Sequence, residues 1–139
     1  MLTRAVLALV LICGAAAAAT AGDTKVLALG LSDHEVTPEA LETGAALPVP
    51  RFNSPAIAYV WAAELKKGDS VEIALVNQDK PLLSNSETLA EDRARYLLQA
   101  GKRGVPAGGW PEGSYHAALK ITRDGKALIE QTSPPVPFE

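Results

Sequence analysis

The feature that most constrains the fold is a hairpin pattern near the end of the chain. From Tyr115 to Thr122, apolar and polar side chains alternate with a period of two, which is typical of a strand with one buried face. Asp124-Gly125 follows, and this pair favours the type I′ turn that joins two antiparallel strands. Lys126–Thr132 is then the return strand. The sequence therefore predicts a β-hairpin over these residues.

The turn before this hairpin carries a family resemblance. It reads Trp110-Pro111-Glu112-Gly113-Ser114-Tyr115, and a tyrosine at the entry to a late strand resembles the tyrosine corner of immunoglobulin-like and fibronectin type III-like sandwiches. From Phe52 to Thr132 the chain is similar to small exported bacterial Ig-like domains. The resemblance implies an all-β fold, a single Ig-like antiparallel β-sandwich of about seven strands, with Trp110 and Tyr115 as a structural corner. The alternative is that Tyr115 is simply a half-buried strand residue.

The first residues, Met1–Ala21, have the features of a secretory signal peptide. Arg4 supplies the positive start, an uncharged apolar run follows, and Ala19-Thr20-Ala21 is a small-x-small cleavage site. We expect cleavage after Ala21, a periplasmic or secreted protein, and one Ig-like domain over residues 22–139. Two alternatives are a lipoprotein attached through Cys13, although the residue before it is not small, and an uncleaved anchor.

Removal of the signal peptide limits the chemistry of the mature chain. Cys13 is the only cysteine and Met1 the only methionine, so thiolate catalysis, disulfides and cysteine-bound metals are excluded. The resemblance is therefore to the disulfide-free branch of Ig-like domains. The full chain has a net charge of −3, and loss of Arg4 makes it more acidic, which argues against nucleic acid as a partner. No second apolar run follows, so we expect no membrane span in the mature chain.

Further strands are expected along the chain, and two of them are ambiguous. The strand predicted at Thr24–Leu31 could also be a buried helix segment. The strand predicted at Arg93–Gln99 has a spacing that also suits a helix, although a sandwich favours a strand. We expect residues 86–91 to form a polar loop. The predicted strands are Thr24–Leu31, Ala56–Leu65, Ser70–Asn77, a short edge strand at Pro81–Leu83, and Arg93–Gln99.

Two segments outside these strands are distinctive. The connection over residues 32–51 contains Thr37-Pro38, a helix-start signal, and Gly44, which ends a short helix. A connection of this length in a compact domain is often functional or partly disordered. The segment over residues 133–139 is rich in proline, so we expect an edge piece or a free end.

The strand Ala56–Leu65 holds a large aromatic residue at its centre. Ile57, Tyr59, Trp61, Ala63 and Leu65 share one face, and we expect Trp61 to fill the core of the sandwich. The alternative is that Trp61 stacks against a ligand.

The residues that could carry catalysis or bind metal form no recognisable constellation. His34 and His116 would have to converge with a carboxylate to hold zinc, and nothing in their spacing requires it. The chain has no Gly-x-Ser-x-Gly, and the carboxylates of Glu91-Asp92 are adjacent, hence on different faces of any regular element. We therefore expect neither an enzyme nor a cofactor. The alternative function is a small-ligand or metal carrier that uses His34 or His116.

The remaining interpretation is a non-catalytic interaction or accessory module of the cell envelope, with an envelope protein of unknown identity as its partner. Among the loops, Ala100–Trp110 combines glycines, the basic pair Lys102-Arg103 and Trp110, and Arg and Trp are enriched at interface hot spots. We therefore expect this loop to take part in the contact. The alternative is that Trp110 tucks under the loop as a structural plug, which leaves Arg103 and the loop backbone to make the contact.

Overall fold

The computed structural model describes residues 23–44, 47–102 and 105–138, which form two antiparallel sheets packed face to face. The expected signal peptide, Met1–Ala21, lies outside the described residues. The elements in chain order are β1 (Lys25–Ser32), α1 (Pro38–Thr43), β2 (Ala56–Leu65), β3 (Ser70–Asn77), β4 (Lys80–Thr88), β5 (Arg93–Lys102), β6 (Ser114–Arg123), β7 (Lys126–Thr132) and β8 (Val136–Pro137). The prediction of an all-β chain with a sandwich of two sheets is confirmed.

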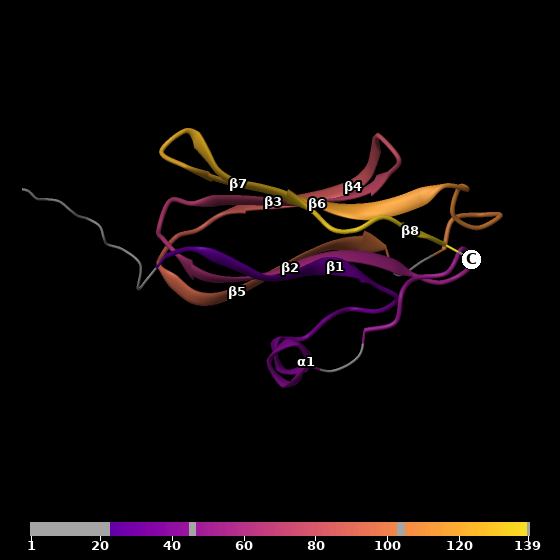
Figure 1. Cartoon of the computed structure of the whole chain (residues 1–139), viewed down its shortest axis with the longest axis horizontal. Coiled ribbons are helices and arrows are strands. Elements are labelled where there is room, and N and C mark those ends of the chain that lie inside the picture. Colours follow the sequence, from indigo (N-terminus) through magenta and orange to yellow (C-terminus); the bar gives the residue numbers. More distant parts are fainter. Residues whose placement is uncertain (1–22, 45–46, 103–104, 139) are drawn as a thin grey trace, which may run out of the picture.

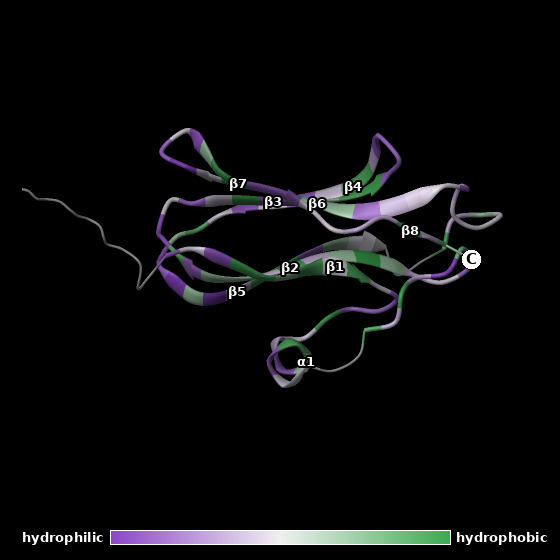
Figure 2. Ribbon diagram, in the orientation of Figure 1, coloured by the Kyte–Doolittle hydropathy of each residue, from purple (hydrophilic) through white to green (hydrophobic). Residues whose placement is uncertain are grey.

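The two sheets contain strands that are not all consecutive in the chain. The first sheet has the order β1-β2-β5, and the second has the order β4-β3-β6-β7, with β8 paired to the start of β6. Figure 1 shows the sheets as two stacked layers, with α1 outside the first sheet. Buried apolar side chains from strands of both sheets form one core between them. Figure 2 shows hydrophobic residues on the strands of both layers. This arrangement buries the apolar face of each sheet against the other.

The hairpin predicted from the alternating pattern is confirmed. β6 and β7 pair antiparallel, and Asp124 and Gly125 join them with φ angles of 53° and 77°, as a type I′ turn requires. The apolar face of β6 points into the core, where each of its side chains is at most 3% exposed: Tyr115, Ala117, Leu119 and Ile121.

The two ambiguous segments are both strands, and the loop predicted at residues 86–91 is wrong for its first three residues. β1 and β5 each pair with β2 along most of their length. The short edge strand predicted at Pro81–Leu83 runs much further, as β4, and pairs with β3 up to Thr88. Residues 86–88 were expected to be loop because they lack an apolar face. β4 lies at the edge of its sheet with most side chains exposed, so backbone pairing holds it without such a face.

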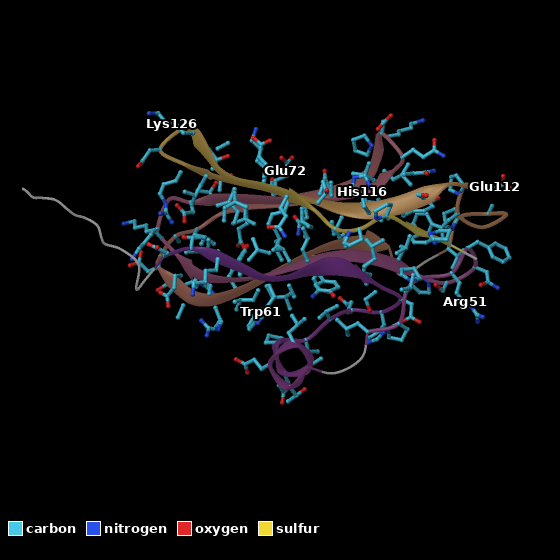
Figure 3. All side chains as sticks on the ribbon, in the orientation of Figure 1. Arg51, Trp61, Glu72, Glu112, His116 and Lys126 are labelled. Carbon is cyan, nitrogen blue, oxygen red and sulfur yellow. The ribbon has the colours of Figure 1, made fainter. Side chains whose placement is uncertain are left out.

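The orientation of β2 corrects the prediction that Trp61 fills the core of the sandwich. Ala56, Ala58, Val60 and Ala62 point into the core between the sheets, so Trp61 and its neighbours Ile57 and Tyr59 lie on the outer face of the first sheet. Figure 3 shows Trp61 on the side of the first sheet that faces α1. Both faces of β2 are apolar, so the sequence pattern could not identify the inner one. Small alanines suit the inner face, because the facing sheet approaches it closely.

The end of β2 departs from regular alternation. Glu64 has a φ of 59°, a left-handed conformation that is uncommon for a residue other than glycine. Beyond it, Leu65 returns to the core that Ala62 also lines, instead of sharing the face of Trp61 as predicted. One irregular residue therefore separates the outer aromatic face from the buried end of the strand.

The long connection after β1 covers the outer face of β2. Its predicted helix is confirmed: Thr37 caps α1 by accepting from Ala40 N–H at 3.2 Å, and Gly44 ends it at a φ of 71°. The side-chain amide of Gln99 on β5 holds the backbone of Val36, accepting from its N–H at 2.7 Å and donating to its carbonyl at 2.9 Å. This connection shields the large side chains of the outer face, so that Trp61 is only 6% exposed.

Candidate interaction surface

The loop that the sequence suggested as a contact region is fastened through Trp110. Trp110 is 7% exposed, its indole N–H donates to the carbonyl of Ser54 at 2.7 Å, and its backbone N–H donates to the carbonyl of Phe52 at 2.8 Å. Its ring packs edge-on against Tyr115, with ring centroids 6.4 Å apart. Trp110 therefore occupies the plug position and offers little surface to a partner. Arg103 lies outside the described residues, and Lys102 is the last residue of β5.

Tyr115 sits at the entry to β6 with its side chain fully buried. Its hydroxyl donates to the carbonyl of Pro111, four residues upstream, and burial raises the pKa of the phenol. The ring stacks on Phe138 with centroids 3.8 Å apart and planes 3° from parallel. The proline-rich tail is therefore attached to the sandwich through Phe138 and through β8, in agreement with the expectation of an edge piece.

Phe52, which the sequence did not single out, is the aromatic residue that this end of the molecule exposes. Its side chain is 47% exposed. A β-carbon at Gly109 would lie 2.7 Å from Cδ2 of Phe52, so the ring packs directly on a glycine backbone. The preceding residue, Arg51, and Ser54 close a turn around Phe52, with Ser54 N–H bonded to the Arg51 carbonyl at 3.1 Å and Arg51 N–H bonded to Ser54 Oγ at 2.8 Å. The ring of Phe52 thus packs on Gly109, the turn from Arg51 to Ser54 fixes its backbone, and nearly half of the residue stays exposed to solvent.

Other exposed apolar side chains occur at the same end. Val49 is 50% exposed and Val105 39%, and both belong to loops that enter or leave the strands where Phe52 does. Figure 1 places these loops and the C-terminal segment together at one end of the sandwich, and Figure 3 shows Arg51 there. We call this surface, made by Val49, Arg51, Phe52 and Val105, the loop end. In the described part of the chain, two other large apolar residues are exposed, Leu27 on β1 and Leu128 on β7.

The edges of the sheets are less suited to binding. Register shifts interrupt the pairing of three outer strands, β1, β4 and β7, and such bulges twist an edge away from straight pairing. On the fourth outer strand, β5, the carbonyl of Gln99 accepts from the Asn85 side-chain amide at 2.9 Å. Addition of a strand from a partner therefore fits these edges poorly.

The outer face of the second sheet holds a wide, shallow hollow of about 690 Å³. Its floor is formed by alanines paired across β3 and β6, Ala74 and Ala118. Beside them Glu72, Lys120 and Glu130 follow one another across three strands, so that opposite charges alternate. This pattern is typical of a solvated sheet face whose charges balance one another.

The two histidines come from different layers. His34 is exposed and its Nδ1 lies 2.7 Å from the carboxylate of its neighbour Asp33, in the connection outside the first sheet. His116 lies on β6, on the outer face of the second sheet (Figure 3). Across residues 23–44, 47–102 and 105–138, no three His, Cys, Asp or Glu side chains are grouped as metal ligands would be.

The opposite end of the sandwich is closed by a buried ion pair. The Asp69 carboxylate, 1% exposed, accepts from Nε and Nη2 of Arg123, both at 2.8 Å, and from Lys66 N–H at 2.9 Å. Hydrogen bonds from the Arg123 guanidinium hold the pKa of the Asp69 carboxyl below its ordinary value, although burial acts in the opposite direction. Arg123 also donates to Thr24 Oγ1 at 2.8 Å, which ties the start of the described chain to this end. The pair is a structural fastening, because both carboxylate oxygens of Asp69 and the Nε and Nη2 groups of Arg123 are bonded within the fold.

Comparison of the sequence with protein-family models and with curated proteins finds no match. Within the part of the chain that the structure describes, no helix has the length and apolar character needed to cross a membrane.

Proposed function

We propose that this chain is an exported, non-catalytic binding module of the cell envelope, periplasmic or secreted, and that its sandwich is Ig-like. Two observations support the Ig-like assignment. The tyrosine hydroxyl at the entry to β6 bonds backbone four residues upstream, as a tyrosine corner does. β4 pairs with β3, as strand C′ pairs with strand C in the variable-type domains of immunoglobulins. Export rests on the signal-like residues Met1–Ala21.

The observation that carries the binding function is the exposure of Phe52 on a fixed backbone. An aromatic side chain held in place loses little conformational entropy on binding, so most of its burial contributes to affinity. Val49 and Val105, in loops at the same end of the sandwich, are also exposed apolar residues. A long loop carried on a rigid sandwich is where such domains usually bind their partners.

The charges near the loop end indicate the chemistry of the partner. Arg51 is exposed beside Phe52, and Lys102 is paired in register with Ala56, at the start of the strand that follows Phe52. The backbone of Lys102 therefore lies at the same end of the first sheet as the start of β2. We propose a partner protein that offers an apolar pocket for Phe52 with acidic residues at its rim. Trp110 contributes to this surface indirectly, as the plug that fixes the turn around Phe52.

Site-specific photo-crosslinking tests this proposal. A photoreactive phenylalanine analogue at position 52 is compared with the same analogue at position 128, because Leu128 has a similar exposure of 42% but lies on β7. We expect position 52, and not position 128, to give one discrete crosslinked product with an envelope protein. Equal products from both positions, or a product from position 128 alone, would contradict the loop end as the binding surface. A crosslink from position 52 to a second copy of this chain would replace the envelope partner with self-association.

A further inference from the structure

A second hollow, of about 580 Å³, lies between α1 and β5 on the outer face of the first sheet. Trp61 forms part of its floor, and Arg93 and Arg95 of β5 line one side. Pro38 and Glu42 of α1 line the other side. We call it the arginine hollow. It exists because the connection crosses over β2 at Trp61, and Gln99 holds that connection in place through Val36.

The donors in the arginine hollow are available. Among the described residues, the Arg93 guanidinium has no hydrogen-bond or ion-pair partner, and Arg95 bonds only the carbonyl of Ala94, at 2.9 Å. The indole N–H of Trp61 also lacks an acceptor within the described chain, in contrast to that of Trp110. Alternate residues on a strand lie about 7 Å apart on the same face, so both guanidinium groups can approach one ligand group. Arg93, Arg95 and Trp61 all line the hollow, and each keeps at least one side-chain donor that is not bonded within the described chain.

The carboxylates at this site have different roles. Glu87 accepts a hydrogen bond from the Tyr96 hydroxyl, and burial, followed by this carboxylate, raises the pKa of Tyr96. Glu87 is thus engaged within the fold. Glu42, on the exposed surface of α1, is the carboxylate that would oppose an anion in the hollow.

We propose that the arginine hollow binds a small organic anion, with a carboxylate or phosphate head held by Arg93 and Arg95 and an apolar body against Trp61. The planar guanidinium fork matches the oxygens of both head groups. Trp61, Leu97 and Pro38 offer the apolar wall, and the volume suits a small molecule. The hollow is open, so we expect affinity in the micromolar to millimolar range. This site is separate from the loop end and does not depend on the proposed protein partner.

Nuclear magnetic resonance of the indole groups tests the site directly. The chain has two tryptophans, so the ¹⁵N-labelled protein gives two indole N–H signals, which a Trp110→Phe variant assigns. Benzoate and phenyl phosphate serve as anionic probes, and benzyl alcohol serves as the neutral control. We expect a saturable shift of the Trp61 signal with one or both anions, a far smaller shift with benzyl alcohol, and no shift of the Trp110 signal.

Charge variants separate a built site from general attraction. The double variant Arg93→Gln, Arg95→Gln should weaken anion binding about tenfold or more, because two charge-assisted hydrogen bonds are lost. Arg51→Gln, which removes an exposed arginine at the loop end, is the matched control and should leave binding unchanged. Glu42→Gln should tighten binding a few-fold, about the effect of removing one nearby like charge.

Several results would overturn the proposal. These are no shift of the Trp61 signal at millimolar anion, an equal shift with benzyl alcohol, or equal affinity in the double arginine variant. Inorganic phosphate binding as tightly as phenyl phosphate would contradict the role of the apolar wall. A Phe52→Ser variant should retain anion binding, so failure of this site and failure of the proposed protein contact are distinguishable.

Discussion

Replacing Asp69 by asparagine should lower the free energy of unfolding substantially, because Asp69 holds together the end of the sandwich opposite the loop end. The carboxylate receives two hydrogen bonds from Arg123 and one from Lys66 N–H, and it is 1% exposed. Asparagine has the same shape, but its amide nitrogen must face at least one of these donors. Breaking a buried pair in this way costs about 3–5 kcal/mol. The Arg123 side chain is 31% exposed and stays partly hydrated, so we expect a loss of about 2–3 kcal/mol for Asp69→Asn.

The dependence of this loss on pH distinguishes the ion pair from a packing defect. The pKa of Asp69 is lowered in the folded protein, so the unfolded chain takes up the proton first as the pH falls. The stabilisation by Asp69 is therefore fully present above the unfolded-state pKa of about 4, and is lost as the pH falls through the lower folded-state pKa. The difference between wild type and Asp69→Asn should be constant from neutral pH to about pH 5 and shrink below about pH 4.

Urea denaturation from neutral to acid pH measures both effects. Asp92→Asn is the matched control, because Asp92 is exposed and, among the described residues, accepts only from Lys67 N–H, at 2.8 Å. We expect its effect to be within about 1 kcal/mol. The reasoning is refuted if Asp69→Asn and Asp92→Asn are equally mild, or if the loss in Asp69→Asn is the same at acid and neutral pH.

Three further predictions concern other parts of the chain. Tyr115→Phe should lower the free energy of unfolding by about 0.5–1.5 kcal/mol without unfolding the domain, because a buried backbone acceptor loses its donor; an unchanged denaturation midpoint would remove the corner. Gln99→Leu should speed amide hydrogen exchange at Val36 about tenfold or more, since the backbone of Val36 loses both partners; the exposed Gln131→Leu is the control, and equal protection in both would contradict the fastening. Intact mass of the exported protein should show cleavage after Ala21, and a lipid-modified N-terminus would contradict it.

The parts of the fold that the sequence predicts are those governed by local signals. The β6–β7 hairpin follows from strict alternation and an Asp-Gly turn, and α1 follows from Thr37, Pro38 and Gly44. The full length of β4 did not follow from the sequence pattern, because residues 86–88 of this edge strand have no apolar face. Backbone pairing with a single neighbour, β3, is enough to hold it. The orientation of β2 was not predictable, because both of its faces are apolar, and the outer one is covered by a connection that lies elsewhere in the chain.

The candidate binding surfaces depend on contacts between distant residues. Phe52 is exposed because Trp110 and Gly109, far along the chain, fix the turn around it. The one local hint was its position before Asn53-Ser54-Pro55, a turn-forming run that leaves little room for a strand. The approach of Arg93 and Arg95 to Trp61 depends likewise on the pairing of β2 with β5 and on the path of α1. Neither arrangement can be predicted from the spacing of these residues along the sequence.

The most direct test of the proposed function is the affinity of the crosslinked envelope partner for two matched variants, Phe52→Ser and Leu128→Ser. Both remove a side chain that is a little under half exposed, so neither should unfold the domain. We expect Phe52→Ser to weaken binding by about 2 kcal/mol or more, roughly thirtyfold, and Leu128→Ser to leave it unchanged. Equal affinity of the two variants, with both correctly folded, would contradict the claim that the loop end is where this protein binds its partner.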